Sequence, residues 1–126
     1  MKRIAAAAVL AAVVLGICVF GRVVTERQTE RIAGVVAEID TLLADGEKER
    51  ALEISEDFLA EWESIHGQLC LFLQHAHLDP LESVFAILPY YIEQDEISLA
   101  RSECRLVQTV TEHILKTERV TLENIL

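Results

Sequence analysis

Residues 51–73, ALEISEDFLAEWESIHGQLCLFL, repeat small and apolar side chains at the spacing of a helix that packs in a bundle. The steps alternate between four and three along Ala51, Ser55, Phe58, Trp62, Ile65, Leu69 and Phe72. This heptad spacing keeps one seam of a helix against its neighbours. A second line at intervals of seven widens the stripe to the width of a core-facing surface. It consists of Leu52, Leu59, His66 and Leu73.

The segment before this helix carries a similar pattern, with apolar residues at intervals of three and four that predict another helix. These residues are Ile32, Val35, Val36, Ile39, Leu42 and Leu43. Asp45 and Gly46 follow them, and glycine suits the left-handed backbone conformation that often ends a helix. We therefore expect this helix to end at Asp45–Gly46 and to continue from the N-terminal segment as a stalk.

Two more helices are predicted after the quoted stretch. The first runs from residue 80 to about residue 94, with Asp79 as its N-cap and Pro80 as its first helical residue. The second runs from about residue 96 to residue 116, with Asp95 as its N-cap. Its inner face comprises Ile97, Ala100, Cys104, Val107, Thr111 and Ile114.

Residues 4–21, IAAAAVLAAVVLGICVFG, form a run without charge between Lys2–Arg3 and Arg22. At about 1.5 Å per residue, such a run reaches roughly 27 Å as a helix, close to the thickness of a hydrocarbon core. Three interpretations are open: a cleaved signal peptide, a lipoprotein signal that ends at Cys18, and an uncleaved anchor. No small-x-small cleavage site follows the run, and Ile17 is bulky for a lipoprotein signal. We therefore favour the uncleaved anchor.

No sustained alternation of a β-strand appears, and the connections between the expected helices are short. The sequence thus predicts an all-α protein with a single N-terminal transmembrane helix followed by a small antiparallel bundle of about four helices. The expected division is an N-terminal membrane anchor over residues 1–21 and an acidic helical-bundle domain over residues 22–126. The short basic N-terminus favours a cytoplasmic N-terminus and an extracytoplasmic domain in the cell membrane, although arginines lie on both sides of the run.

The net charge of the chain is −10, and all of the acidic residues follow the apolar run. Because Lys2 and Arg3 precede this run, the remainder carries −12. A domain of this charge repels nucleic acid, so we expect no such partner. Cys70 lies at the edge of its helix and Cys104 in a seam, which favours two free thiols over a disulfide bond, although the sequence does not decide this.

The stretch LFLQHAHLDPLE, residues 71–82, contains residue types that bind metals. His75 and His77 would point about 200° apart on one helix, so they converge only if the chain is not helical there. As a turn, the stretch has a simpler meaning: Asp79, Pro80 and Glu82 form a capping-box variant. His75, Asp79 and Glu82 remain the candidate metal ligands, with turn and cap as the favoured interpretation.

His66, His113 and Trp62 are interpreted as packing residues because they lie on or beside apolar faces. The sequence has no Ser-His-Asp order, nucleophile elbow, phosphate loop or Cys-x-x-Cys motif. We therefore expect neither an enzyme nor a cofactor.

Several short motifs carry a family resemblance. Trp62 lies within a helix, and a His-x-x-Leu-Asp-x-Leu-Glu run begins at His75. The segments ISLARSECRL (97–106) and TLENIL (121–126) follow. With the N-terminal anchor and the acidic helical domain, these features resemble domain-of-unknown-function family 4363 (DUF4363) over nearly the whole chain. The resemblance implies a small membrane-anchored helical protein of a kind found mainly in Gram-positive spore-forming bacteria.

The family pattern has acidic residues after the histidine, where this chain has Ala76 and His77. The resemblance therefore extends to His75, Asp79 and Glu82 but not to His77. It implies no activity. From the broad apolar stripes, we expect a protein-interaction module that acts with a protein partner, for example a second membrane protein. The alternative is a metal- or small-ligand-binding sensor that uses His75, Asp79 and Glu82. The oligomeric state does not follow from the sequence.

Overall fold

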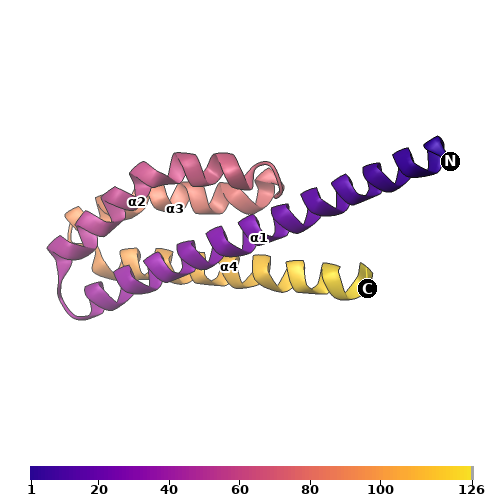
Figure 1. Cartoon of the computed structure of the whole chain (residues 1–126). Helices are drawn as coiled ribbons and strands as arrows, with labels where there is room; N and C mark the ends of the chain where they lie inside the picture. The colour runs from indigo at the N-terminus through magenta and orange to yellow at the C-terminus, as the bar shows by residue number, and fades with distance from the viewer. Residues whose placement is uncertain (126) are drawn as a thin grey trace.

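The computed structural model describes residues 1–125, and in this part the chain forms four α-helices and no strand (Figure 1). The helices are α1 (Lys2–Ala44), α2 (Lys48–Leu69), α3 (His75–Glu93) and α4 (Ile97–Ile125). α1 contacts α2 and α4, and α3 contacts the same two helices. Short turns make successive helices antiparallel, so the four form an up-and-down bundle. The predicted all-α bundle is confirmed.

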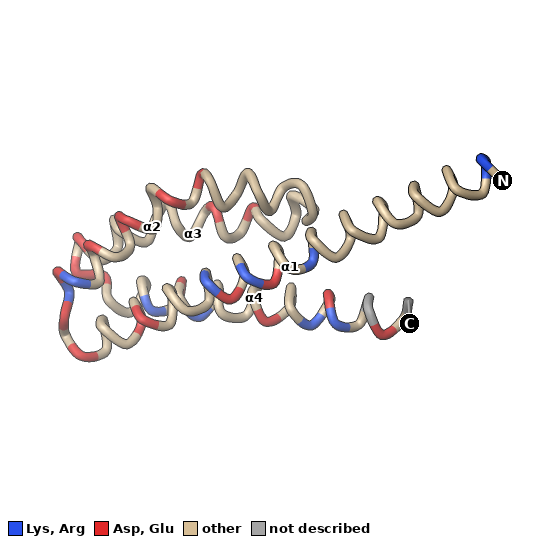
Figure 2. The backbone as a smooth tube through the Cα atoms, in the orientation of Figure 1, with Lys and Arg blue, Asp and Glu red and all other residues tan. Residues whose placement is uncertain are grey.

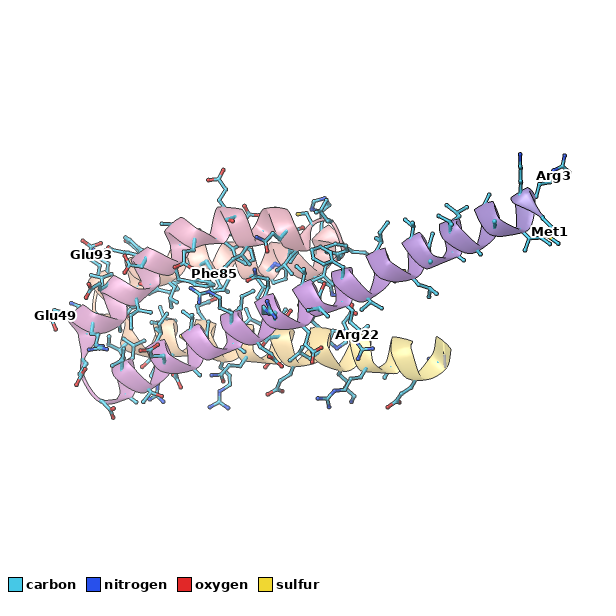
Figure 3. The ribbon with its side chains drawn as sticks, viewed as in Figure 1. Met1, Arg3, Arg22, Glu49, Phe85 and Glu93 are labelled. Carbon is cyan, nitrogen blue, oxygen red and sulfur yellow. The ribbon has the colours of Figure 1, made fainter. Side chains whose placement is uncertain are left out.

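The core contains most residues of the predicted seams; Phe72 and Ile97, at the ends of two of them, are only half-buried. On α2, Ala51, Ser55, Phe58, Trp62, Ile65 and Leu69 are all at most 5% exposed. On α4, Ala100, Cys104, Val107, Thr111 and Ile114 are buried. Phe85 of α3 lies inside the bundle, where its ring centroid is 4.9 Å from that of Phe58 and 4.8 Å from that of Trp62 (Figure 3). Burial of large side chains of this kind stabilises the fold by about 1.5–3 kcal/mol each.

The connection between α1 and α2 forms at Gly46, as the sequence predicts. Gly46 has a φ of +79°, in the left-handed region that glycine adopts without steric cost. The amide of Glu47 donates to the carbonyl of Leu42 at 2.9 Å, and the amide of Gly46 donates to that of Leu43 at 3.3 Å. This pair of bonds is the Schellman motif, which satisfies the last carbonyl groups of a helix.

α3 begins at His75 and not at Pro80, so the predicted start was wrong. Gln74, whose backbone is extended, precedes the helix, and Asp79 lies inside it and does not cap it. The earlier start buries Leu78 completely. This gain, about 1.5–3 kcal/mol, is comparable with the cost of about 3 kcal/mol for a proline within a helix. His75 and His77, which were expected in the turn before the helix, therefore lie in the first turn of α3.

Asp95 was also misassigned, because it does not cap α4. It has a φ of +61° and takes the position after α3 that Gly46 takes after α1. The amide of Glu96 donates to the carbonyl of Tyr91 at 2.9 Å, and the amide of Asp95 donates to that of Ile92 at 3.1 Å. Aspartate tolerates this conformation better than most residues other than glycine and asparagine. α3 and α4 are therefore joined by a second Schellman motif.

α1 is a single helix that runs from the apolar segment into the bundle without interruption. Residues 1–20 are all exposed, and the first buried residue of α1 is Gly21. Figure 2 shows that this protruding part carries no charge between its first residues and the point where α1 enters the bundle. Among the helices of the described residues, α1 alone is long and apolar enough to cross a membrane, judged by length and composition.

Ion pairs connect neighbouring elements at the surface of the bundle. The pairs in the described residues are Arg31–Glu61, Arg101–Asp40 and Lys48–Asp95. They join α1 to α2, α1 to α4, and the start of α2 to the α3–α4 turn. Because these side chains are between a quarter and three quarters exposed, each pair contributes about 1 kcal/mol at most. The bundle is thus held mainly by its apolar core.

Candidate functional site

The end of the bundle where α1 emerges has a distinct structure, and we call it the junction end. It comprises Gly21, the α2–α3 turn (residues 70–74) and the first turn of α3. Figure 1 shows this turn beside α1, where α1 leaves the bundle. The ring of Phe72 packs on α1 at Gly21, where a Cβ atom would approach it to 2.5 Å. Phe72 also meets Phe20 edge to face, with a centroid distance of 6.3 Å. The α2–α3 turn therefore rests on α1 where the protruding segment begins.

Three potential metal ligands meet beside this turn. They are His66 and Cys70 at the end of α2 and His75, the first residue of α3. One ligand atom from each lies within 4.8 Å of the other two. The sulfur of Cys70 is 3.5 Å from Nε2 and 3.6 Å from Nδ1 of His66, and 3.8 Å from Nδ1 of His75. His66 and Cys70 are half-buried and His75 is exposed, so solvent reaches the group.

The fold explains this convergence. His66 and Cys70 are four residues apart and therefore lie on the same face at the end of α2. The short turn then reverses the chain and brings His75 to the same side. On the core side of the cluster, the ring of Trp62 lies 5.6 Å from that of His66. Trp62 Nε1 is buried, and no hydrogen-bond partner for it lies among the described residues.

His77, the second histidine of residues 71–82, points away from this cluster. His77 faces His113 of α4, with ring centroids 6.2 Å apart, whereas the ring of His75 lies 6.5 Å from that of His66. Both residues are helical, so residues two apart point to different sides. This divergence agrees with the prediction that His75 and His77 would not converge within a helix.

The candidate residues Asp79 and Glu82 are exposed on α3. With His75 they follow one face of the helix, because they are four and seven residues from it. That line extends over about 10 Å at 1.5 Å per residue. The structure groups only His75 with other potential ligands in its described part, and these are His66 and Cys70.

His66 and Cys70 were interpreted from the sequence as flank and edge residues of a helix. Both are half-buried, which agrees with that interpretation. Their proximity to His75 was missed because a helix end and a short turn intervene. A His-x-x-x-Cys pair on the last turn of a helix, followed after a few residues by another histidine, is the signal in the sequence that points to such a cluster.

The remaining thiols differ from Cys70. Cys104 is completely buried in α4 and Cys18 is exposed in the protruding segment, and all three cysteines are free. Burial raises the pKa of Cys104 from its ordinary value of 9.0 to about 12, with a further contribution from the charge of Asp40. Asp40 also bonds to Arg101, which raises the pKa of that guanidinium. Cys104 therefore remains a neutral core residue at physiological pH.

Comparison with known proteins gives one family. The sequence profile of a family described as "Domain of unknown function (DUF4363)" matches residues 19–125. The match covers the whole bundle and begins in the last residues of the apolar segment. Searches of curated proteins and of solved structures give no match.

Proposed function

The chain belongs to the DUF4363 family, and from this premise we propose that it is a single-pass membrane protein whose bundle stands at the membrane surface and binds a protein partner. The family description assigns no activity, so the proposal depends on the structure of this chain. We propose a binding role and not catalysis because the sequence contains none of the common catalytic motifs.

The observation that carries the proposal is the exposed apolar part of α1. Large side chains of this segment are more than half exposed on all sides of the helix, among them Leu10, Leu15, Ile17, Val19 and Phe20. In water, such a surface would drive association of the protein with any apolar phase. A bilayer covers a helix of this length around its whole circumference. The first buried residue, Gly21, lies where the apolar run ends, so the bundle would begin at the membrane surface.

We propose that the bundle lies outside the cytoplasm, because a short basic segment before the apolar run, here Lys2 and Arg3, is typical of an anchor whose N-terminus stays in the cytoplasm. Cys104 is buried, Cys70 is half-buried and Cys18 lies in the apolar segment itself, so the native thiols are poor reporters of the orientation. We therefore suggest Glu56→Cys, an exposed position on α2, in a chain that has serine at its three natural cysteine positions. A membrane-impermeant maleimide should label it in intact cells. Labelling only after lysis would place the bundle in the cytoplasm.

The bundle offers a surface for a partner on α4. Leu99, Leu106 and Val120 are 45–46% exposed and are separated by multiples of seven residues. They therefore follow one line along the helix, which is the arrangement that packs against a second helix. Because the anchor would confine the bundle to the membrane surface, a partner in the same membrane meets it at high effective concentration.

Photocrosslinking in native membranes tests this proposal. A photoreactive residue at position 106 should give an adduct with a second protein, and Leu99→Ser should reduce that adduct. A photoreactive residue at the exposed Asp57 of α2 serves as the control. Equal adducts at positions 57 and 106, or none at position 106, would contradict a partner on α4.

A further inference from the structure

We propose that His66, Cys70 and His75 form a binding site for a transition-metal ion of the Zn²⁺ class, with water as the fourth ligand. This site goes beyond the proposed anchoring and partner binding and does not depend on them. It differs from the set predicted from the sequence, because His75 is its only member in common with His75, Asp79 and Glu82.

The two distances from the Cys70 sulfur to the histidine nitrogens fit such an ion. With Zn–S bonds of about 2.3 Å and Zn–N bonds of about 2.0–2.1 Å, tetrahedral geometry separates sulfur and nitrogen by about 3.6 Å. The sulfur of Cys70 is 3.5 Å from His66 Nε2 and 3.8 Å from His75 Nδ1. The sulfur is nearly equidistant from both nitrogens of His66, so either ring nitrogen is near enough to act as the ligand once the ring turns toward the ion.

The elements that carry the ligands hold them in place. His66 and Cys70 belong to the end of α2, whose neighbours Ile65 and Leu69 are buried in the core. His75 begins α3, which the burial of Leu78 fixes in position. The turn between them is held against α1 by Phe72. Ligands that packing places beforehand lose little conformational freedom when they bind an ion.

The ligand types select the class of ion. One thiolate and two imidazoles favour Zn²⁺ and related soft or borderline ions, whereas Ca²⁺ and Mg²⁺ prefer oxygen ligands. On binding, the Cys70 thiol releases its proton to solvent as the sulfur–metal bond forms, and both imidazoles bind in their neutral form. Three protein ligands and solvent access leave a fourth position for water.

The experiment uses the full-length chain without a histidine tag, in detergent micelles and under reducing conditions. Co²⁺ is the probe, because its tetrahedral complexes absorb strongly and a bound thiolate adds a charge-transfer band. We expect one Co²⁺ per chain with both signals, and displacement by Zn²⁺. Cys70→Ser should remove the charge-transfer band. His66→Gln and His75→Gln should each weaken binding at least about 10-fold, the scale on which even outer-shell changes act.

Matched controls are available in the same chain. Cys104→Ala alters the buried thiol, and His77→Gln alters the neighbouring histidine that faces α4. Both variants should bind Co²⁺ as the unmodified protein does. Far-ultraviolet circular dichroism checks that each variant is folded, and Cys70→Ser is the mildest change because Cys70 lies at a helix end. Absence of a thiolate band, its survival in Cys70→Ser, or an equal loss in His77→Gln and His75→Gln would overturn the proposal.

Discussion

Gly21 occupies the position in α1 where the exposed segment gives way to the bundle. Its missing side chain allows the ring of Phe72 to lie directly on the helix backbone. Nothing in the spacing of apolar residues distinguishes Gly21 from Gly16, yet no atom lies within 4 Å of a Cβ atom built at Gly16. The difference arises only from the position of the α2–α3 turn, which the sequence pattern does not give.

Gly21→Ala should therefore destabilise the bundle. Its Cβ atom would lie 2.5 Å from the Phe72 ring, and the overpacking of a close contact costs about 1–3 kcal/mol. Guanidinium unfolding followed by the fluorescence of Trp62, the only tryptophan, measures the loss. Gly16→Ala is the control: it raises helix propensity in the same way but creates no close contact, so it should not lower the unfolding midpoint. In a Phe72→Ala background, the effect of Gly21→Ala should disappear; an undiminished effect would exclude the contact as its cause.

The buried thiol of Cys104 should make stability depend on pH in the alkaline range. Burial raises its pKa from 9.0 to about 12, so between these values the unfolded chain loses this proton while the folded chain retains it. The free energy of unfolding should then fall by up to about 1.4 kcal/mol per pH unit, and this contribution is fully present below pH 9. Unfolding curves at several pH values check this expectation.

The control for the alkaline transition is Cys104→Ala, which removes the thiol but leaves the other alkaline groups. Its stability should fall less steeply above pH 9, although its absolute stability is reduced by the lost packing. Parallel curves for the two proteins would show that Cys104 is not the group responsible.

At the scale of helices, the faces could be predicted from the sequence but several ends could not. The seam from Ala51 to Leu69 follows from the heptad spacing alone, because burial repeats with the period of the helix. The end at Gly46 could be predicted because glycine favours the left-handed conformation. The start of α3 could not, because local rules favour Asp79 as a cap while burial of Leu78 extends the helix past it.

The candidate site shows the same limit. From the sequence, His75 could be predicted as a candidate ligand, but His66 and Cys70 could not be predicted as its neighbours. Their proximity to His75 depends on how the α2–α3 turn reverses the chain. Pairs within one helix are predictable from spacing, as the divergence of His75 and His77 illustrates. Groups that meet across a turn require the position of both helix ends.

Gly34 and Gly46 test the effect of backbone conformation alone, because a side chain at either position would meet no neighbouring side chain. No atom lies within 4 Å of a Cβ atom built at Gly34 or Gly46, but only Gly46 has a positive φ. Gly46→Ala should destabilise the protein by about 1–2 kcal/mol, because alanine strains the left-handed conformation. Gly34→Ala should stabilise it by about 1 kcal/mol, because alanine is the better helix former. Thermal unfolding followed by circular dichroism measures both changes, and shifts of the same sign would contradict this reasoning.

At the scale of the whole molecule, α1 belongs to two structures. Residues 2–20 contribute no buried residue, and the rest of the helix supplies one side of the core with Ile32, Val36, Ile39 and Leu43. Because the helix is unbroken, the bundle cannot tilt freely relative to the protruding segment. Glu49 and Glu93 lie at the opposite end of the bundle from this segment, next to the two Schellman turns (Figure 3). If the segment spans a membrane, this acidic end points away from it.

A deletion of residues 1–20 should therefore release a folded bundle into solution. It removes only exposed residues and one edge-to-face ring contact, Phe20–Phe72, which is worth about 0.5–1.5 kcal/mol. Ultracentrifugation should leave the shortened chain in the supernatant, and its unfolding free energy should lie within about 1.5 kcal/mol of the full-length value. A deletion of residues 1–31, which also removes the buried Gly21, Thr25 and Thr29, should abolish cooperative unfolding. Aggregation of the shorter deletion would instead mean that the apolar segment belongs to the fold of the bundle, and the proposed division between anchor and domain would be wrong.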